Sequence, residues 1–209
     1  MKHRHIVVEG PIGCGKTTLA TRLAERIGGK VLLEDPKANP FLGQFYRDMR
    51  RYALPTQLFF LFQRVQQLEG LRQPDLFEKP IVADFTLAKD PLFARLTLDD
   101  AEYQLYSKIY DHVRPQAPVP DLVVYLQASV DTLVQRVKKR GNPIETGIDD
   151  EYLRRLSDAY TRYFLAYSES PLLIVNSERL NFVDNREHFD LLVERMEAMR
   201  GGREFFNRA

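Results

Sequence analysis

The segment from Gly10 to Thr17 constrains this chain more than any other part of its sequence. It reads GPIGCGKT and fits the pattern G-x-x-x-x-G-K-[ST] without a mismatch. An apolar run at residues 5–9 precedes it, and a helical pattern from about residue 16 to residue 27 follows. Glycines let successive backbone N–H groups curl around a polyphosphate, and the following helix points its positive end at the same place. The sequence therefore predicts a strand, a phosphate-binding loop and a helix, in that order.

Individual residues of this loop are predicted to hold ATP and a magnesium ion. Lys16 is expected to reach the β- and γ-phosphates, and the Thr17 hydroxyl is expected to ligate Mg²⁺. Cys14 is expected to be a small filler of the loop whose alkylation would hinder nucleotide binding. The ATP-binding residues predicted in this segment are Gly10, Gly13, Gly15, Lys16, Thr17 and Thr18.

The rest of the chain alternates short β-branched runs with longer stretches of helical period. This alternation is typical of a parallel sheet with helices on both faces. No repeat, low-complexity segment or obvious linker divides the chain, so a single domain over residues 1–209 is expected. Pro55 is predicted to open a long helix, because proline loses nothing at the first helical position. We predict a three-layer α/β fold with five strands, at about residues 5–9, 31–33, 81–83, 122–126 and 172–175.

Charge and cysteine content exclude several classes of protein. The 30 basic and 29 acidic residues leave a formal net charge of +1, so no global field gathers polyanions. The longest apolar runs fall far short of the roughly 20 residues that span a bilayer. The single cysteine, Cys14, forms no internal disulfide, which favours a reducing compartment. We therefore expect a cytoplasmic protein without a nucleic-acid or membrane partner.

Two acidic residues stand where predicted strands end. Glu34 follows the run at residues 31–33, and Asp84 follows the run at residues 81–83. The carboxyl ends of neighbouring parallel strands face one crevice, so both side chains should converge on the phosphate-binding loop. Asp84 is suited to hold Mg²⁺ beside Thr17, and Glu34 is suited to accept a proton from an attacking hydroxyl. The alternative is that both are ordinary strand-end acids, which are common in turns.

A nucleotide switch of the GTPase type is excluded by two missing motifs. Neither Asp-x-x-Gly nor Asn/Thr-Lys-x-Asp occurs anywhere in the chain. The remaining classes include a kinase that phosphorylates a small molecule, which would use the two strand-end acids.

Further segments carry a resemblance to a known family. They are EDP at residues 34–36, NPF at 39–41, FY at 45–46, DFTLAKD at 84–90, and the basic run 136–140 followed by Glu145. With the phosphate-binding loop, they make the chain similar to the deoxynucleoside kinase family, and most like its bacterial deoxyadenosine and deoxyguanosine members. The resemblance implies a P-loop kinase fold, ATP and Mg²⁺, a deoxynucleoside substrate, a homodimer built on long helices, and a short lid at about residues 136–148.

The same resemblance implies how the acceptor is held. Glu34 matches the catalytic glutamate, Tyr52 the tyrosine that holds the sugar 3′-hydroxyl, and Gln63, eleven residues later, the glutamine that pairs with the base. A buried amide has donors and an acceptor for a base edge, although a half-exposed glutamine on a helix is the plainer interpretation. The predicted substrate-binding residues are Glu34, Tyr46, Tyr52, Gln63, Asp84, Lys89 and Glu145.

Arg136 and Arg140 are predicted to clamp the transferring phosphoryl group. They are four residues apart on one helical face, although cations at a helix end are also favoured by the helix dipole alone. Two departures from the family limit the comparison: Phe85 and Asn142 stand where many relatives carry arginine. Lys89 is the nearest cation to Phe85, and we expect it to take part of that role. The predicted catalytic residues are Glu34, Lys16, Arg136 and Arg140.

The resulting hypothesis is a kinase that transfers the γ-phosphate of ATP to the 5′-hydroxyl of a deoxynucleoside, with a purine base expected. One alternative is a nucleoside monophosphate kinase of the thymidylate type, which would need a cation close to Glu34 for the acceptor's own phosphate. Lys37 is the only lysine or arginine between Glu34 and Arg47. Another alternative is an ATP-binding switch that phosphorylates no metabolite.

Overall fold

The computed structural model of this chain describes residues 3–70, 79–114 and 118–207, which form a parallel sheet flanked by helices. The described strands are β1 His5–Glu9, β2 Lys30–Leu32, β3 Ile81–Ala83, β4 Leu122–Gln127, β5 Leu172–Asn176 and β6 Arg203–Phe206. They lie in the order β2-β3-β1-β4-β5-β6, and every neighbouring pair is parallel. The described α-helices are α1 Lys16–Ile27, α2 Leu42–Phe45, α3 Met49–Glu69, α4 Asp90–Thr97, α5 Asp100–Val113, α6 Val130–Arg140, α7 Asp150–Ala166 and α8 Arg186–Ala198.

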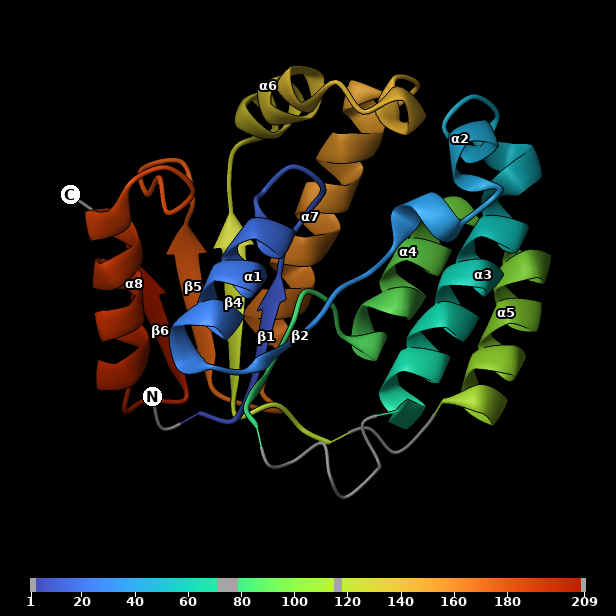
Figure 1. The fold of residues 1–209 in the computed structure, drawn as a ribbon. Coiled ribbons are helices and arrows are strands. Elements are labelled where there is room, and N and C mark those ends of the chain that lie inside the picture. Colours follow the sequence, from blue (N-terminus) through green and yellow to red (C-terminus); the bar gives the residue numbers. More distant parts are fainter. Residues whose placement is uncertain (1–2, 71–78, 115–117, 208–209) are drawn as a thin grey trace.

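The sheet separates two apolar cores, which confirms the predicted three layers. Successive strand residues point to opposite faces, so Ile6 and Val8 pack against α1 and α8, whereas Val7 packs against the helices of the other face. Figure 1 shows α1 and α8 on one side of the strands, and α3, α4 and α5 together on the other. Both faces are covered, as a parallel sheet requires.

The prediction of five strands was wrong by one. The extra strand, β6, pairs with β5 at the edge of the sheet. Its four residues, Arg203–Phe206, alternate between exposed and half-buried side chains, and Phe205 is 59% exposed. Such a short edge strand has no apolar run that would distinguish it from a loop, so only its backbone pairing with β5 identifies it.

Helix α3 begins six residues before the predicted start at Pro55. The Asp48 carboxylate accepts a hydrogen bond from the backbone N–H of Arg51 at 3.3 Å and caps the helix at Met49. Pro55 therefore lies inside the helix. The prediction failed because proline fits a first turn well, but packing can also hold it within a longer helix.

The predicted lid connects α6 to α7. Ser129 caps the start of α6, and Gly141 ends the helix with a φ of 62°, in the left-handed region that glycine adopts without strain. A short 3₁₀ turn, η5 Pro143–Glu145, leads on to α7. In Figure 1 this connection lies beyond the end of the sheet near α2. Among the described helices, none is long and apolar enough to cross a membrane.

Candidate active site

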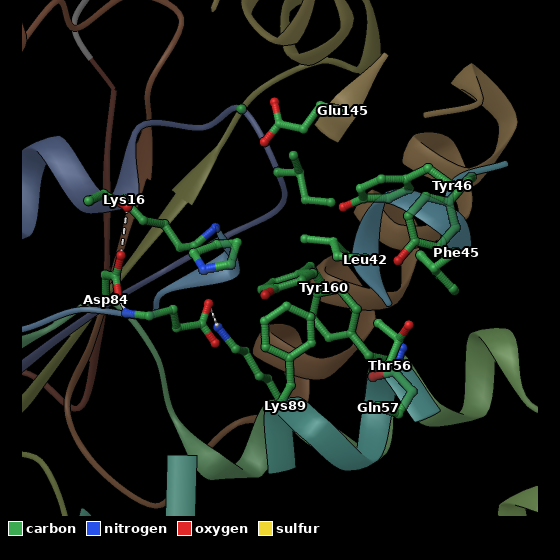
Figure 2. A pocket seen from close by; sticks show the side chains of 18 of the residues that line it. Lys16, Leu42, Phe45, Tyr46, Thr56, Gln57, Asp84, Lys89, Glu145 and Tyr160 are labelled. Atoms are coloured by element: carbon green, nitrogen blue, oxygen red, sulfur yellow. Dashed lines mark hydrogen bonds and ion pairs between the residues drawn. The ribbon is translucent and has the colours of Figure 1, made fainter. Parts of the chain in front are cut away.

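A cavity of about 190 Å³ lies where the phosphate-binding loop, the strand ends and the helices α2, α3 and α7 meet. Figure 2 shows Lys16 and Asp84 on one side of it and Phe45 and Tyr46 on the other. The lining residues are Ile12, Gly13, Gly15, Lys16, Thr17, Thr18, Glu34, Pro36, Leu42, Phe45, Tyr46, Thr56, Gln57, Phe60, Arg64, Asp84, Lys89, Phe93, Arg140, Glu145, Tyr152 and Tyr160.

The phosphate-binding loop has the backbone that its glycines predict. Gly10 has a φ of 151°, and a Cβ atom there would lie 2.5 Å from the carbonyl oxygen of Leu126. Lys16 is folded over the loop, because its ammonium donates to the carbonyl oxygens of Gly10 at 2.8 Å and Pro11 at 3.3 Å. Burial opposes this charge, but the surrounding acidic groups outweigh burial and hold the pKa of Lys16 above its ordinary value. Lys16 is thus a permanent cation at the loop.

The two predicted metal ligands are in direct contact. The Thr17 hydroxyl donates to Asp84 Oδ2 at 2.6 Å, and Asp84 Oδ1 accepts from the backbone N–H of Glu34 at 2.9 Å. Mg²⁺ prefers hard oxygen ligands and commonly takes only one or two from the protein, with phosphates and water supplying the rest. The described residues contain no cluster of three or more His, Cys, Asp and Glu that could hold a metal without such help. The pair fits a metal ion that arrives with a nucleotide.

Glu34 is held between two cations. Its Oε1 accepts from Arg64 Nε at 2.5 Å, and its Oε2 lies 3.0 Å from the Lys89 ammonium. Burial raises the pKa of Glu34, but the charges of Arg64, Lys89 and Lys16 outweigh burial and lower it to about 2. Glu34 is therefore ionised at neutral pH and keeps lone pairs free to accept a further hydrogen bond.

A second set of acidic groups holds these cations in place. Arg64 also pairs with the buried Asp90, and Lys89 lies 3.6 Å from Glu9 Oε1. Glu9 is fully buried; it accepts from the backbone N–H of Thr86 at 2.6 Å and from the Tyr160 hydroxyl at 3.2 Å. Burial raises the pKa of Glu9, although all these neighbours are hydrogen-bond donors that suit a carboxylate. Lys89, four residues after Phe85, thus places a cation beside Glu34, although Phe85 itself stands where many relatives carry arginine.

Aromatic rings and two polar side chains of α3 form the other side of the cavity. Figure 2 shows Thr56 and Gln57 on the same side as Phe45 and Tyr46, away from Asp84. Gln57 is only 4% exposed, and burial raises the pKa of the Tyr46 hydroxyl well above its ordinary value, so that it stays a neutral donor. A cavity lined by aromatic rings and a few polar groups suits an aromatic heterocycle attached to a sugar.

The lid contributes an ion pair to the cavity. Arg140 and Glu145 both line the cavity, and Arg140 lies 2.7 Å from Glu145 Oε2. Arg136 is turned elsewhere: its guanidinium donates to the hydroxyl of Ser177 at 3.2 Å and to the carbonyl oxygen of Ser177 at 2.7 Å. The two predicted arginines therefore do not meet in this arrangement.

The structure brings most of the predicted site residues to the cavity and leaves a few outside. Gly10 lies at the base of the loop, and Arg136 binds Ser177. Gln63 is turned to the backbone of the segment that follows β2, where its amide donates to the carbonyl oxygen of Asp35 at 3.2 Å. Tyr52 packs against the core beside Arg51. None of these four predicted residues, Gly10, Arg136, Gln63 and Tyr52, lines the cavity.

Gln57 and Arg64 are among the cavity residues that the sequence analysis did not predict. A signal for Gln57 was available, because Tyr46 and Gln57 are eleven residues apart, the same spacing as Tyr52 and Gln63. Arg64 follows Gln57 by seven residues and therefore falls on the same face of α3. The spacing alone did not choose between the two tyrosine–glutamine pairs.

Comparisons with known proteins identify the family. The family model described as Deoxynucleoside kinase matches residues 6–199. The chain belongs to the deoxynucleoside kinase family. This kinase is 33% identical over 199 residues to the deoxyguanosine kinase of Bacillus subtilis, which covers 93% of this chain and 96% of the relative. It is 32% identical over 194 residues to the deoxyadenosine kinase of Lactobacillus acidophilus, which covers 86% of this chain and 88% of the relative.

Solved structures of relatives share the fold of this kinase. The deoxyadenosine kinase of M. mycoides with bound dATP has a TM-score of 0.81 at 27% identity, over 93% of this chain and 100% of the other. The same enzyme with bound dCTP has a TM-score of 0.79 at 26% identity, over 93% and 99%. The protein is therefore a nucleotide-binding phosphotransferase that acts on a deoxynucleoside hydroxyl, in place of the two alternative functions considered from the sequence.

Proposed function

We propose that this kinase transfers the γ-phosphate of ATP to the 5′-hydroxyl of a purine deoxynucleoside. One observation carries the proposal: the loop residues Lys16 and Thr17 line the same cavity as the carboxylate of Glu34 and the amide of Gln57. The cavity therefore offers a triphosphate end, an acceptor for a hydroxyl proton and a polar group for a base. Relatives that are named deoxyguanosine kinase and deoxyadenosine kinase support the purine preference.

The loop end of the cavity would hold the phosphates of ATP. Lys16 would exchange its bonds to the loop carbonyls for bonds to the β- and γ-phosphates. The adjacent oxygens of Thr17 and Asp84 would hold Mg²⁺, which would offset the negative charge of the phosphates when it is bound. The N-terminus of α1 directs its partial positive charge at the same place.

Glu34 would orient the 5′-hydroxyl for attack on the γ-phosphorus. Because its pKa is about 2, it is a stable hydrogen-bond acceptor across the physiological range. Phosphoryl transfer proceeds through a loose transition state and needs alignment more than strong base catalysis. Arg64 and Lys89 would fix the carboxylate in position. Glu34 would take the hydroxyl proton as the new P–O bond forms and the bond from the γ-phosphorus to the β-phosphate oxygen breaks, which releases ADP.

The nucleoside would lie between the aromatic residues and the lid. We assign the sugar contact to the neutral Tyr46 hydroxyl and to Glu145, and the base contact to Gln57, in place of Tyr52 and Gln63. Arg140 would leave its pair with Glu145 to reach the transferring phosphoryl group, and Arg136 would join it only if the lid moves.

Partners and location extend the same proposal. We expect a homodimer, because large apolar side chains stand exposed on the neighbouring helices α3 and α5, where Phe62 is 51% exposed and Leu105 is 49% exposed. An ATP-dependent enzyme whose single cysteine forms no internal disulfide is expected to work in the cytoplasm.

A coupled assay of ADP release tests the proposal. The acceptors are the four deoxynucleosides, their ribose counterparts and deoxyadenosine monophosphate. Turnover with a purine deoxynucleoside and not with the monophosphate is expected.

Glu34→Gln should lower kcat at least about a hundredfold, because a neutral amide cannot take the hydroxyl proton, with little change in ATP affinity. Turnover with the monophosphate alone, or a kcat of Glu34→Gln equal to that of the wild-type kinase, would contradict it.

A further inference from the structure

The amide of Gln57 is anchored by a residue that lies outside the cavity. Its Nε2 donates to the Thr97 hydroxyl oxygen at 3.3 Å, across the contact between α3 and α4. The Thr97 hydroxyl itself donates to the carbonyl oxygen of Phe93, one turn earlier in α4, at 2.9 Å. Thr97 is not among the residues that line the cavity.

These two hydrogen bonds fix the orientation of the Gln57 amide. A hydroxyl group has one proton, and in Thr97 that proton is used toward Phe93. Toward Gln57, Thr97 can therefore only accept, so the nitrogen of the amide must face Thr97 and the oxygen must lie on the other side. A rotation of the amide by half a turn would either place two acceptors against each other or require Thr97 to give up its bond to Phe93, and Gln57 is too buried for water to replace the lost bond.

The orientation of an amide matters for the two common purines. Adenine presents a donor at its 6-amino group and an acceptor at N1, whereas guanine presents an acceptor at its 6-oxo group and a donor at N1. An amide that pairs with both positions of one purine must turn by half a turn to pair with the other. An amide that turns freely accepts both, and an anchored amide favours one.

We propose that Thr97 is a positioning residue for purine specificity, because it holds the Gln57 amide in the orientation that matches one of the two purine bases. The proposal rests on the proposed function, in which Gln57 contacts the base. Two other polar groups that line the cavity, Arg64 and Thr56, have no amide whose orientation could select one purine. Arg64 is a donor in either case, and the buried Thr56 hydroxyl can donate or accept. Thr97 therefore sets the part of the purine preference that depends on the orientation of the Gln57 amide.

The test compares deoxyadenosine with deoxyguanosine as acceptors for the wild-type kinase, Thr97→Val and Thr97→Ser. Valine has the shape of threonine without its hydroxyl, whereas serine keeps the hydroxyl. We expect a clear wild-type preference for one purine, expressed as the ratio of the two kcat/KM values. In Thr97→Val that ratio should move toward one by about fivefold, the worth of one hydrogen bond, with the KM for ATP unchanged. Thr97→Ser should keep the wild-type ratio.

A double-mutant cycle with Gln57→Leu separates an effect on the amide from a general shift of α4. Once the amide is absent, Thr97→Val should change the purine ratio no further. Four results would overturn the role of Thr97. The first two are equal use of both purines by the wild-type kinase and a wild-type ratio in Thr97→Val. The others are a lost preference in Thr97→Ser and an equal effect of Thr97→Val with and without Gln57. If Gln57→Leu itself left the kcat/KM of both nucleosides unchanged, the base contact in the proposed function would fail instead, and the role of Thr97 with it.

Discussion

At the scale of single residues, Glu34 contributes to stability as well as to the site. Its pKa is lowered from 4.5 to about 2 in the folded chain, so its stabilising effect is fully present above about pH 4.5 and is lost as the pH falls toward 2. Glu34→Gln should lower the free energy of unfolding on the order of 3 kcal/mol, because Arg64 and Lys89 lose a shared partner. Urea unfolding at about pH 5 and about pH 8 should give the same loss.

The matched control for this change is Glu25→Gln, an exposed carboxylate on α1. It should change the free energy of unfolding by less than about 0.5 kcal/mol at either pH. A loss for Glu34→Gln that grows strongly between the two pH values would mean that Glu34 titrates near neutrality, and the lowered pKa would then be incorrect.

Cys14 fills space in the loop, as the sequence led us to expect. Its side chain is fully buried, and burial raises the pKa of its thiol. Because only an exposed thiolate reacts readily, a thiol reagent should label the native chain at least about tenfold more slowly than the chain in urea. Equal labelling rates in the two states, followed by absorbance, would show that the loop opens freely.

At the scale of elements, Glu9 joins β1 to α7 through the Tyr160 hydroxyl. Tyr160→Phe keeps the ring stacked on Tyr125 and Phe164 and removes only this hydroxyl. Because the lost bond goes to a buried acidic group, the change should cost about 2 kcal/mol in urea unfolding. Tyr125→Phe is the control, since its hydroxyl faces the neutral hydroxyl of Thr161 at 3.3 Å, and it should cost about 1 kcal/mol. A smaller loss for Tyr160→Phe than for the control would contradict this view of Glu9.

At the scale of the whole molecule, the exposed apolar side chains of α3 and α5 bear on the proposed homodimer. Phe62→Glu combined with Leu105→Glu should convert a dimer to a monomer in sedimentation velocity at micromolar concentration, because charges would be buried in the interface. Leu165→Glu on α7, where Leu165 is 50% exposed, is the matched control and should leave the dimer intact. A monomeric wild-type chain, or a dimer that survives the double change, would exclude this interface.

The strand–loop–helix unit and the strand-end acids were determined by the sequence alone. Gly10 to Thr17, Glu34 and Asp84 could be predicted because a glycine pattern and a polar residue after an apolar run are local features, and parallel strands bring such ends to one edge. The three layers follow from the same alternation of strands and helices.

Tertiary structure alone decided which tyrosine and which glutamine face the cavity. Gln57 and Gln63 lie on one helix with the same chemistry, and the face that α3 turns inward depends on its start at Met49 and on its packing against α2 and α4. Burial of Cys14, the clamp on Glu34 and the pairing of β6 likewise depend on segments far apart in the chain. Contacts of this kind leave no periodic trace in the sequence, because the partners are set by how whole elements pack.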